Sequence, residues 1–433
     1  MKILLKTAPL CLALFAPSVQ VQAKAADAGI ASPDTANQRT VMNTEYGSIF
    51  AKPNGFPYSD FGVYIGASWY STNLNPDAIK GKYSHFNHFG PADALIGFPY
   101  TALRQYEASE VKAGRNPIFV TATYKGKKRP VLYVDYLGLK NNKPTTSSNT
   151  WVYAVNVQDL RFINWWIDNY ARPVVLNPMI PLKNAWVYVD GCAFNYASYG
   201  VIDDNDNFVA GVAWDSPFPS TPNSYLTSIA TFFNTLHQIA PDINVMADTG
   251  SMSDPNQFST VYANVAGALE EDVYGWHSNP SSWVVNHWYT TTIPWFSWLG
   301  AQGKVGVMGA FLPVNYESGA LLVSFAFYEL VKGPNFFFAP RVGGTAIPLT
   351  AGWLDWNTKL GLPVSAFQST QQAGQSAGHC LFSRAYTNGY VYLNWTGVTQ
   401  TVTLPTGSTW LDPNGNKVTT LTIPTWTGTF VNR

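Results

Sequence analysis

The chain has 433 residues, and its 26 basic and 26 acidic side chains give a formal net charge of zero. No basic stripe is available to neutralise phosphates, so we expect no nucleic-acid partner. Charged residues make up only 12% of the chain, whereas aromatic residues reach 15%. Aromatic faces flanked by neutral polar groups suit sugar rings, although most of these aromatic side chains are expected in the core.

The first 25 residues have the pattern of a secretory signal peptide. Lys2 and Lys6 precede an apolar stretch over residues 8–19, and small residues around Ala23 suit a signal peptidase. The stretch is too short for a permanent transmembrane helix. We therefore expect a secreted or periplasmic protein with no integral membrane segment after signal removal. Residues 26–55, rich in Ala, Thr, Asn and Pro, are typical of an N-terminal extension.

Residues 56–372 alternate between short apolar runs and segments with helical spacing. This alternation is typical of parallel strands joined by crossover helices. It predicts an α/β fold, a (β/α)8 TIM-type barrel that forms the catalytic domain. The expected strands cover residues 61–66, 116–122, 130–135, 185–191, 243–248, 263–271, 304–310 and 335–339, and the expected helices cover 159–170, 225–239 and 319–332.

Residues 373–433 follow a different pattern, with short alternating strands over 381–386, 389–394 and 401–404 and a hairpin turn at 412–416. They predict a C-terminal β-sandwich-like domain of antiparallel strands. The mature chain retains two cysteines, Cys192 and Cys380. Secretion permits a disulfide between them, but two separate buried thiols fit the sequence equally well.

Acidic residues end several of the predicted barrel strands. Catalytic groups of such barrels lie at the C-terminal ends of the strands, where Asp190, Asp248 and Glu271 are found. Strand alternation places Glu271 and Leu269 on one face and Glu270 on the other. We expect Asp190 and Glu271 to form the catalytic pair, with Glu270 and Asp248 as reserves. Capping of the next segment or a solvated acidic loop is the structural alternative.

Weaker candidates for substrate binding lie near the same strand ends. They are Asp135, His85, His88, Trp276, His277 and Trp288, each of which has packing as its ordinary alternative. The six His residues show no ligand-like spacing with Cys or carboxylates, so we expect no metal site. Phosphate-loop, dinucleotide and nucleophile-elbow motifs are absent from the sequence, and no cofactor is expected.

The strand-end motifs resemble a group of bacterial glycoside hydrolases, the hypothetical glycosyl hydrolase family 15-like barrels and their relatives. The similarity covers roughly residues 60–430 and is carried by VYVDGCAFN at 187–195, GALEE at 267–271 and FSRAYTNG at 382–389. This chain has Asn195 where related barrels often have a second Asp, and Asp248 where an Asn is common. The resemblance implies glycoside hydrolysis, with Asn195 beside the substrate.

The sequence therefore predicts a secreted protein that cleaves glycosidic bonds of a polysaccharide or oligosaccharide. One carboxyl group would protonate the leaving oxygen while the other attacks or activates water. Which of the two acids has which role, and whether the anomeric configuration is retained or inverted, stays open. The alternative is a non-catalytic glycan-binding or cell-envelope protein built on the same barrel, since one fold hosts many functions.

Overall fold

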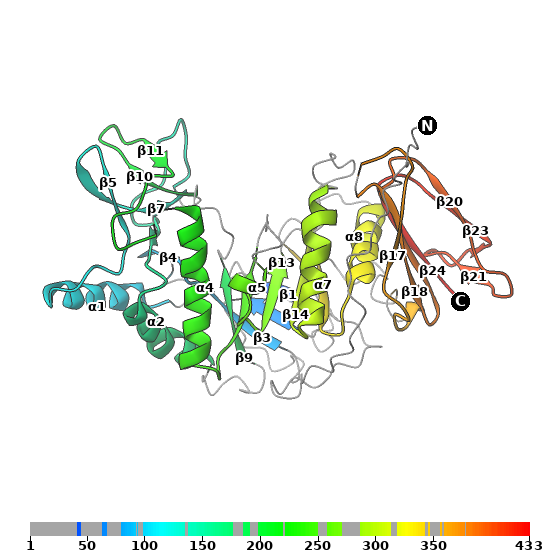
Figure 1. The fold of residues 1–433 in the computed structure, drawn as a ribbon, viewed down its shortest axis with the longest axis horizontal. Helices are drawn as coiled ribbons and strands as arrows, with labels where there is room; N and C mark the ends of the chain where they lie inside the picture. The colour runs from blue at the N-terminus through cyan, green and yellow to red at the C-terminus, as the bar shows by residue number, and fades with distance from the viewer. Residues whose placement is uncertain are drawn as a thin grey trace, which may run out of the picture.

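A computed structural model gives the fold of the chain (Figure 1). It describes residues 41–44, 63–66, 79–91, 93, 98–134, 137–175, 185–190, 198–219, 221–249, 258–270, 286–312, 318–342, 345–346, 356, 359–376 and 378–433. Predicted segments 1–25 and most of 26–55 lie outside these residues. In the described part, no helix is long and apolar enough to cross a membrane.

A sheet of parallel strands lies at the centre of the molecule. Its order is β1-β2-β3-β9-β12-β13-β14-β15-β16, and only β16 pairs antiparallel to its neighbour. The strands are β1 (Val41–Thr44), β2 (Val63–Gly66), β3 (Ile79–His85), β9 (Ala185–Asp190), β12 (Asn244–Asp248), β13 (Gly267–Glu270), β14 (Val305–Leu312), β15 (Phe336–Val342) and β16 (Thr345–Ala346). The predicted α/β class with a parallel sheet is confirmed. One strand, β1, comes from the segment predicted as an extension.

The two ends of this strand order lie near each other, because β1 also contacts β15. Among the described residues, the buried side chains on one sheet face form a cluster of their own. This inner cluster consists of Ile79, Trp186, Tyr188, Met246, Leu269, Val305, Val307, Phe337 and Ala339. Strands β1 and β15 stand far apart in the strand order, so their contact requires the sheet to curl, and the helices on its other face leave this face on the inside. This face is therefore concave, although a ladder that closes the ring is not among the described strand pairings.

Helices cover the other face of the sheet. They are α2 (Leu160–Trp166), α3 (Arg172–Val175), α4 (Pro222–Ile239), α5 (Phe258–Val261), α7 (Ile293–Ala301) and α8 (Ser318–Val331), with π-helical turns η5 (Ile167–Ala171) and η9 (Trp288–Thr292). Helix α4 starts at a capping box, in which Thr221 and Ser224 satisfy each other's backbone N–H and Pro222 occupies the first turn. Its buried side chains join Val187, Val189 and Ala268 in the large helix-facing core.

Two chain segments, one after β3 and one between β9 and α4, together form a separate lobe. We call the described residues of 86–157 and 198–219 the inserted lobe (Figure 1). It holds α1 (Tyr100–Lys112), a hairpin of β5 (Thr121–Tyr124) and β6 (Lys127–Pro130), and an antiparallel sheet. That sheet contains β4 (His88–Phe89), β7 (Leu132–Tyr133), β8 (Tyr153–Ala154), β10 (Tyr199–Ile202) and β11 (Phe208–Ala210). The prediction that residues 116–122 and 130–135 are barrel strands is therefore wrong. Their apolar residues fill this lobe instead.

The C-terminal segment forms antiparallel sheets, as predicted. A six-stranded sheet has the order β17-β18-β19-β24-β21-β22, and β20 pairs with β23. The strands are β17 (Gln368–Gln371), β18 (Cys380–Tyr386), β19 (Gly389–Asn394), β20 (Gln400–Thr403), β21 (Trp410–Leu411), β22 (Lys417–Val418), β23 (Thr420–Ile423) and β24 (Thr427–Asn432). The sheet thus begins at Gln368, ahead of the predicted boundary at residue 373. It packs on α8 so closely that a methyl group on Gly428 would lie 2.6 Å from the Ala326 side chain.

Candidate functional site

Polar residues end neighbouring strands of the parallel sheet at a common level. His85 at the end of β3 pairs with Asp190 at the end of β9. Ala247 pairs with Val189, so Asp248 follows beside Asp190. The carboxyl ends of parallel strands meet at one edge, and the sheet thus brings a histidine and two acids together there.

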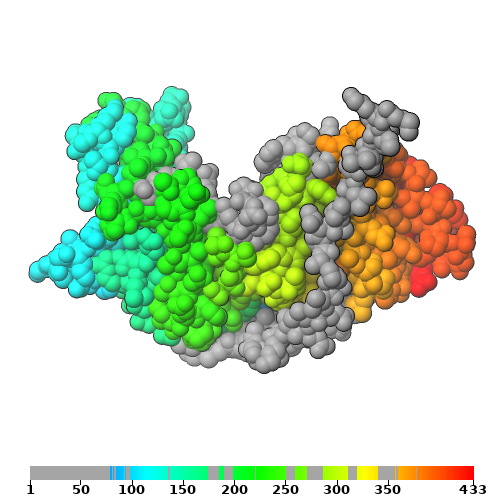
Figure 2. Space-filling model, viewed as in Figure 1, coloured from blue at the N-terminus to red at the C-terminus, as the bar shows by residue number. Residues whose placement is uncertain are grey.

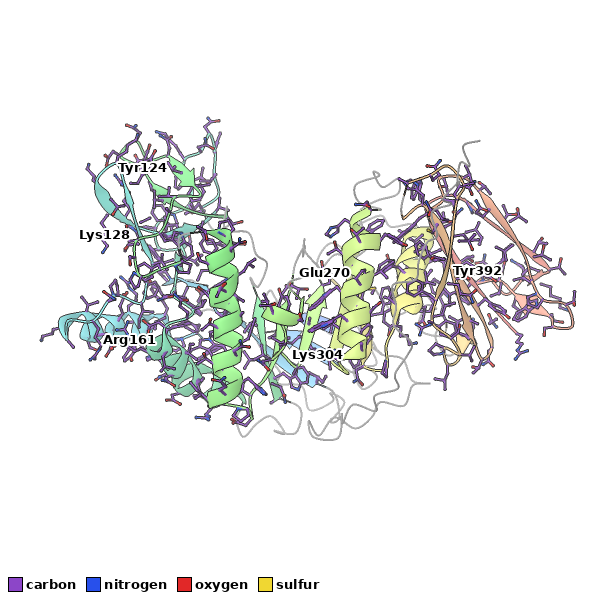
Figure 3. The ribbon with its side chains drawn as sticks, viewed as in Figure 1. Tyr124, Lys128, Arg161, Glu270, Lys304 and Tyr392 are labelled. Carbon is purple, nitrogen blue, oxygen red and sulfur yellow. The ribbon has the colours of Figure 1, made fainter. Side chains whose placement is uncertain are left out.

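This edge of the sheet faces a hollow in the molecular surface. Figure 2 shows the hollow between the inserted lobe and the part of the molecule that carries α7. In Figure 3, Glu270 at the end of β13 lies toward this hollow, whereas Lys304, just before β14, lies at the opposite end of the strands. The predicted strand-end acids therefore belong to the end of the sheet that is nearer this hollow.

Asp248 is buried on the concave face and is fixed by a phenol. The hydroxyl of Tyr188 donates a 2.6 Å hydrogen bond to Asp248 Oδ2. Tyr188 belongs to the inner cluster and precedes Asp190 by two residues on β9. A hydrogen bond to an ionised group is stronger than one between neutral groups, so this contact orients Asp248 beside Asp190. Tyr188 was not among the predicted site residues, although it precedes Asp190 by two residues on the same strand.

Glu270 lies in a different environment from Asp248. Its carboxylate Oε2 accepts a 2.9 Å hydrogen bond from Thr249 Oγ1, and the Thr249 hydroxyl also lies 3.0 Å from the Leu269 carbonyl. Thr249 N donates to that same carbonyl at 2.9 Å. Glu270 and Thr249 therefore join the ends of β12 and β13. Leu269 packs in the inner cluster and Ala268 in the helix-facing core, as the predicted alternation requires.

His85 is buried at the end of β3 and contacts a carboxylate from the inserted lobe. Its Nδ1 lies 2.8 Å from Asp93 Oδ1, while Asp93 Oδ2 accepts a 2.6 Å hydrogen bond from Gly90 N. Asp93 thus holds both the imidazole and the turn that leads out of the strand. Asp93 could not be recognised in the sequence, because it lies eight residues after His85 and belongs to no motif.

His88 belongs to a buried polar network that joins the inserted lobe to α4. Its ring stacks on Tyr133 with centroids 4.3 Å apart, and its Nδ1 lies 3.1 Å from the Tyr199 hydroxyl. Tyr225 on α4 extends the network, with its hydroxyl 3.3 Å from that of Tyr199 and accepting a 2.9 Å hydrogen bond from Asn87 Nδ2. His88 therefore packs inside the protein, and the prediction that it binds substrate hydroxyls is not supported.

Burial lowers the pKa of the His88 imidazole well below its ordinary value, and the charge of nearby His85 lowers it further. The two rings lie 4.4 Å apart. His88 is consequently neutral at neutral pH and can take part in hydrogen bonds without carrying a buried charge.

Trp288 is also a packing residue, contrary to its predicted place in a sugar-binding wall. It is only 4% exposed and packs against Trp395 of the C-terminal domain at 5.1 Å between ring centroids. A ring enclosed on this interface offers no free face to a sugar. Its helical environment could not be recognised from the cluster of aromatic residues alone.

Several predicted site residues lie outside the described part of the chain. They are Glu271, Asn195, Asp135, Trp276 and His277, together with Cys192. Asp190 is placed by its backbone in β9. Cys380 is buried in β18, and its pairing with Cys192 stays one of the two alternatives from the sequence because Cys192 lies outside the described residues. Among the described His, Cys, Asp and Glu side chains, no group of three or more could hold a metal ion.

Comparison with known proteins gives only distant structural likeness. No family model matches the chain, and no curated protein does either. Among solved structures, a mutant of MutB in complex with glucose is 8% identical with a TM-score of 0.46, covering 92% of this chain and 99% of that one. Eubacterium rectale Amy13B is 9% identical with a TM-score of 0.43, covering 92% and 96%. An alpha-amylase from Geobacillus thermoleovorans is 10% identical with a TM-score of 0.38, covering 92% and 98%. Likeness at this level assigns neither a family nor an activity to the chain.

Proposed function

We propose that the protein is a secreted glycoside hydrolase that cleaves a polysaccharide or oligosaccharide at the carboxyl ends of a (β/α)8 barrel. The observation that carries this proposal is the row of acids on consecutive strands, Asp190 on β9, Asp248 on β12 and Glu270 on β13. Glycoside hydrolysis needs two carboxyl groups on either side of one bond. A row of acids at an edge that faces a surface hollow meets this need.

Asp190 and Glu271 are the proposed catalytic pair. Tyr188 and Leu269 belong to the inner cluster, and side chains two residues apart on a strand share a face. The alternation of side chains along a strand predicts that Asp190 and Glu271 share this face. Because β12 separates β9 from β13, the two backbones are expected about 10 Å apart, twice the spacing of paired strands. On this prediction, the two carboxyl groups would lie on either side of a glycosidic bond.

The competing proposal is a glycan-binding protein without catalysis. It would use the same concave edge and tolerate the loss of either acid. The buried carboxylate of Asp248, with its own phenol donor, favours catalysis, because burial of a carboxylate is costly and neutral sugars can be bound without one.

The test is sugar release from a panel of polysaccharides by the purified full chain, its Asp190→Asn variant and its Glu271→Gln variant. Asp168→Asn is the matched control, because that carboxylate is 65% exposed on η5 and distant in sequence from the strand ends. Each catalytic variant should lose release by about 10²-fold to 10⁴-fold, while the control keeps it. Binding without release by the wild type would support the non-catalytic alternative. Unchanged release in both catalytic variants would rule out this pair.

Export is proposed from residues 1–25 and has its own test. The mature protein recovered from outside the cytoplasm should lack these residues when its N-terminus is sequenced. Recovery of the full-length chain only inside the cells would contradict this part of the proposal.

A further inference from the structure

The inserted lobe contains a pocket of about 800 Å³ between α1 and the β5–β6 hairpin. This volume falls within the range of small-molecule sites. Lys128, which lines it, lies at the outer side of the lobe in Figure 3, away from Glu270. The pocket is therefore separate from the candidate catalytic edge.

Three aromatic side chains form one part of its lining, Tyr100, Phe119 and Tyr153. Phe119 meets Tyr100 and Tyr153 edge-on, with ring centroids 6.0 and 6.5 Å apart. Burial raises the pKa of Tyr100 to about 12 and also raises that of Tyr153, so both phenols stay protonated at neutral pH. They offer ring faces together with hydroxyl donors, which is the combination that a sugar uses.

The carboxylate and the two arginines that line the pocket form hydrogen bonds and ion pairs within the protein. Both carboxylate oxygens of Glu107 accept hydrogen bonds. Oε1 accepts one from Phe119 N at 2.8 Å, and Oε2 accepts one from Arg104 Nη1 at 2.7 Å. Arg129 is held by the carboxylate of Asp204 and by the Ile202 carbonyl at 2.7 Å. These pairs leave the two arginine charges balanced.

Two lysines of the lining have ammonium groups that are available to bind a ligand. Lys112 on α1 and Lys128 on β6 are exposed, and neither forms an ion pair within the described residues. Asp215 lies near Lys128 but forms no ion pair with it, and its carboxylate is held by hydrogen bonds from Thr121 Oγ1 at 2.9 Å and Thr123 N at 2.8 Å. The pocket therefore has an excess of positive charge beside an aromatic surface.

We propose that this pocket binds a carboxylated saccharide, such as a short chain of uronic acid residues. The partly exposed rings of Tyr100 and Tyr153 would pack on the sugar faces while Lys112 and Lys128 bind carboxylates. Phe119 is buried beneath the Arg104 guanidinium, which lies 4.4 Å from its ring centroid, and supports the two tyrosines from behind. This inference goes beyond the proposed function, because it describes a second binding site that needs no catalysis. Compact phosphate would use the lysines without the rings, and a neutral sugar would use the rings without the lysines.

The test is calorimetric titration of trigalacturonate into the full chain carrying Asp190→Asn, so that hydrolysis does not interfere. Maltotriose is the neutral comparison ligand, and inorganic phosphate is added as a competitor. The combined Lys112→Ala and Lys128→Ala variant should weaken trigalacturonate binding about fivefold to tenfold at low salt. Tyr153→Ala should weaken it as well. Lys417→Ala, which removes an exposed lysine of β22 in the C-terminal domain, is the matched control.

Four results would overturn the inference. They are absence of trigalacturonate binding, equal affinity for maltotriose, full displacement by phosphate at the same concentration, and equal weakening by Lys417→Ala. The exposed lysines can be removed without disturbing the core, and circular dichroism verifies that each variant is folded. Failure here leaves sugar release by the Asp190-containing chain unaffected, so the two proposals are tested separately.

Discussion

The contact between α8 and the C-terminal sheet depends on a fully buried carboxylate, that of Glu329. The Tyr386 hydroxyl lies 2.6 Å from Glu329 Oε2 and 2.6 Å from its backbone carbonyl oxygen. Lys332 Nζ donates to the same carboxylate at 3.1 and 3.2 Å. We predict that Tyr386→Phe destabilises the protein by weakening this network while leaving the ring in place.

The magnitude follows from the single proton of the Tyr386 hydroxyl. It can donate to only one of the two Glu329 oxygens at a time, and the carboxylate is the stronger acceptor. Loss of a hydrogen bond to a charged group costs about 1.5–3 kcal/mol. Phe fills almost the same volume, so no cavity adds to this cost. The variant should therefore lose about 1.5–3 kcal/mol of unfolding free energy at pH 7.

Equilibrium unfolding in guanidinium chloride, followed by circular dichroism, measures this loss as a lower midpoint. Tyr390→Phe is the control, because Tyr390 is half-buried against Tyr392 and Trp410 and its hydroxyl has no hydrogen-bond partner among the described residues. This control should change stability by less than about 0.5 kcal/mol. Equal midpoints for Tyr386→Phe and Tyr390→Phe would refute the reasoning.

The pH dependence gives a second measurement of the same contact. Burial and the charge of Glu329 raise the pKa of Tyr386 well above its ordinary value. The folded protein therefore holds the phenolic proton more tightly than the unfolded chain, and the stabilisation is present in full below about pH 10. It declines as the pH rises above 10, by at most about 1.4 kcal/mol per pH unit. The stability difference between wild type and Tyr386→Phe should accordingly shrink between pH 10 and pH 11.

Two further substitutions test the parallel sheet. Tyr188→Phe removes the hydroxyl that donates to Asp248, so the variant should lose about 1.5–3 kcal/mol of unfolding free energy. Any sugar release should fall as well. An unchanged midpoint in chemical unfolding would contradict the role of this hydrogen bond. Gly267→Ala would place a methyl group 2.8 Å from Val305 Cβ and 2.9 Å from the Val305 carbonyl oxygen. This crowding should lower the unfolding free energy by about 1–3 kcal/mol. Gly319→Ala, with open space around it, should not lower the melting temperature, and similar losses in both glycine variants would contradict the packing argument.

The central strands could be predicted from the sequence because their composition is unambiguous. Strands β9, β12 and β14 are nearly continuous apolar runs, which is typical of parallel strands buried on both faces. Helix α4 was predicted from its apolar spacing, and its capping box adds a local reason for the start at Pro222. Local sequence suffices where both faces of a strand are buried.

The inserted lobe was mistaken for barrel strands because short apolar runs look alike in either place. A local signal did exist between β5 and β6. Lys125 and Gly126 form the turn, with φ angles of 49° and 75°, and a two-residue turn with both φ values positive is typical of an antiparallel hairpin. A Lys-Gly pair is a weak form of that signal, and residues 116–122 and 130–135 were therefore predicted as barrel strands where a hairpin forms.

The hydrogen-bond partners of the site could not be predicted, because they come from distant parts of the chain. Tyr188 reaches Asp248 across 60 residues, and Asn87 reaches Tyr225 across 138. Such contacts depend on strand register and on the position of the inserted lobe. Residue type alone gave His88 and Trp288 a binding role, whereas their burial gives them a packing role.

The neighbouring acids at the end of β13 show how register adds to sequence pattern. Alternation alone separates Glu270 from Glu271 but does not say which face is concave. The structure supplies that direction, because Leu269 packs in the inner cluster while Ala268 packs against the helices. The bond from Thr249 then gives Glu270 a role in joining β12 to β13. This contact accounts for the Glu270 carboxylate, and the choice of Glu271 as the partner of Asp190 stays a prediction.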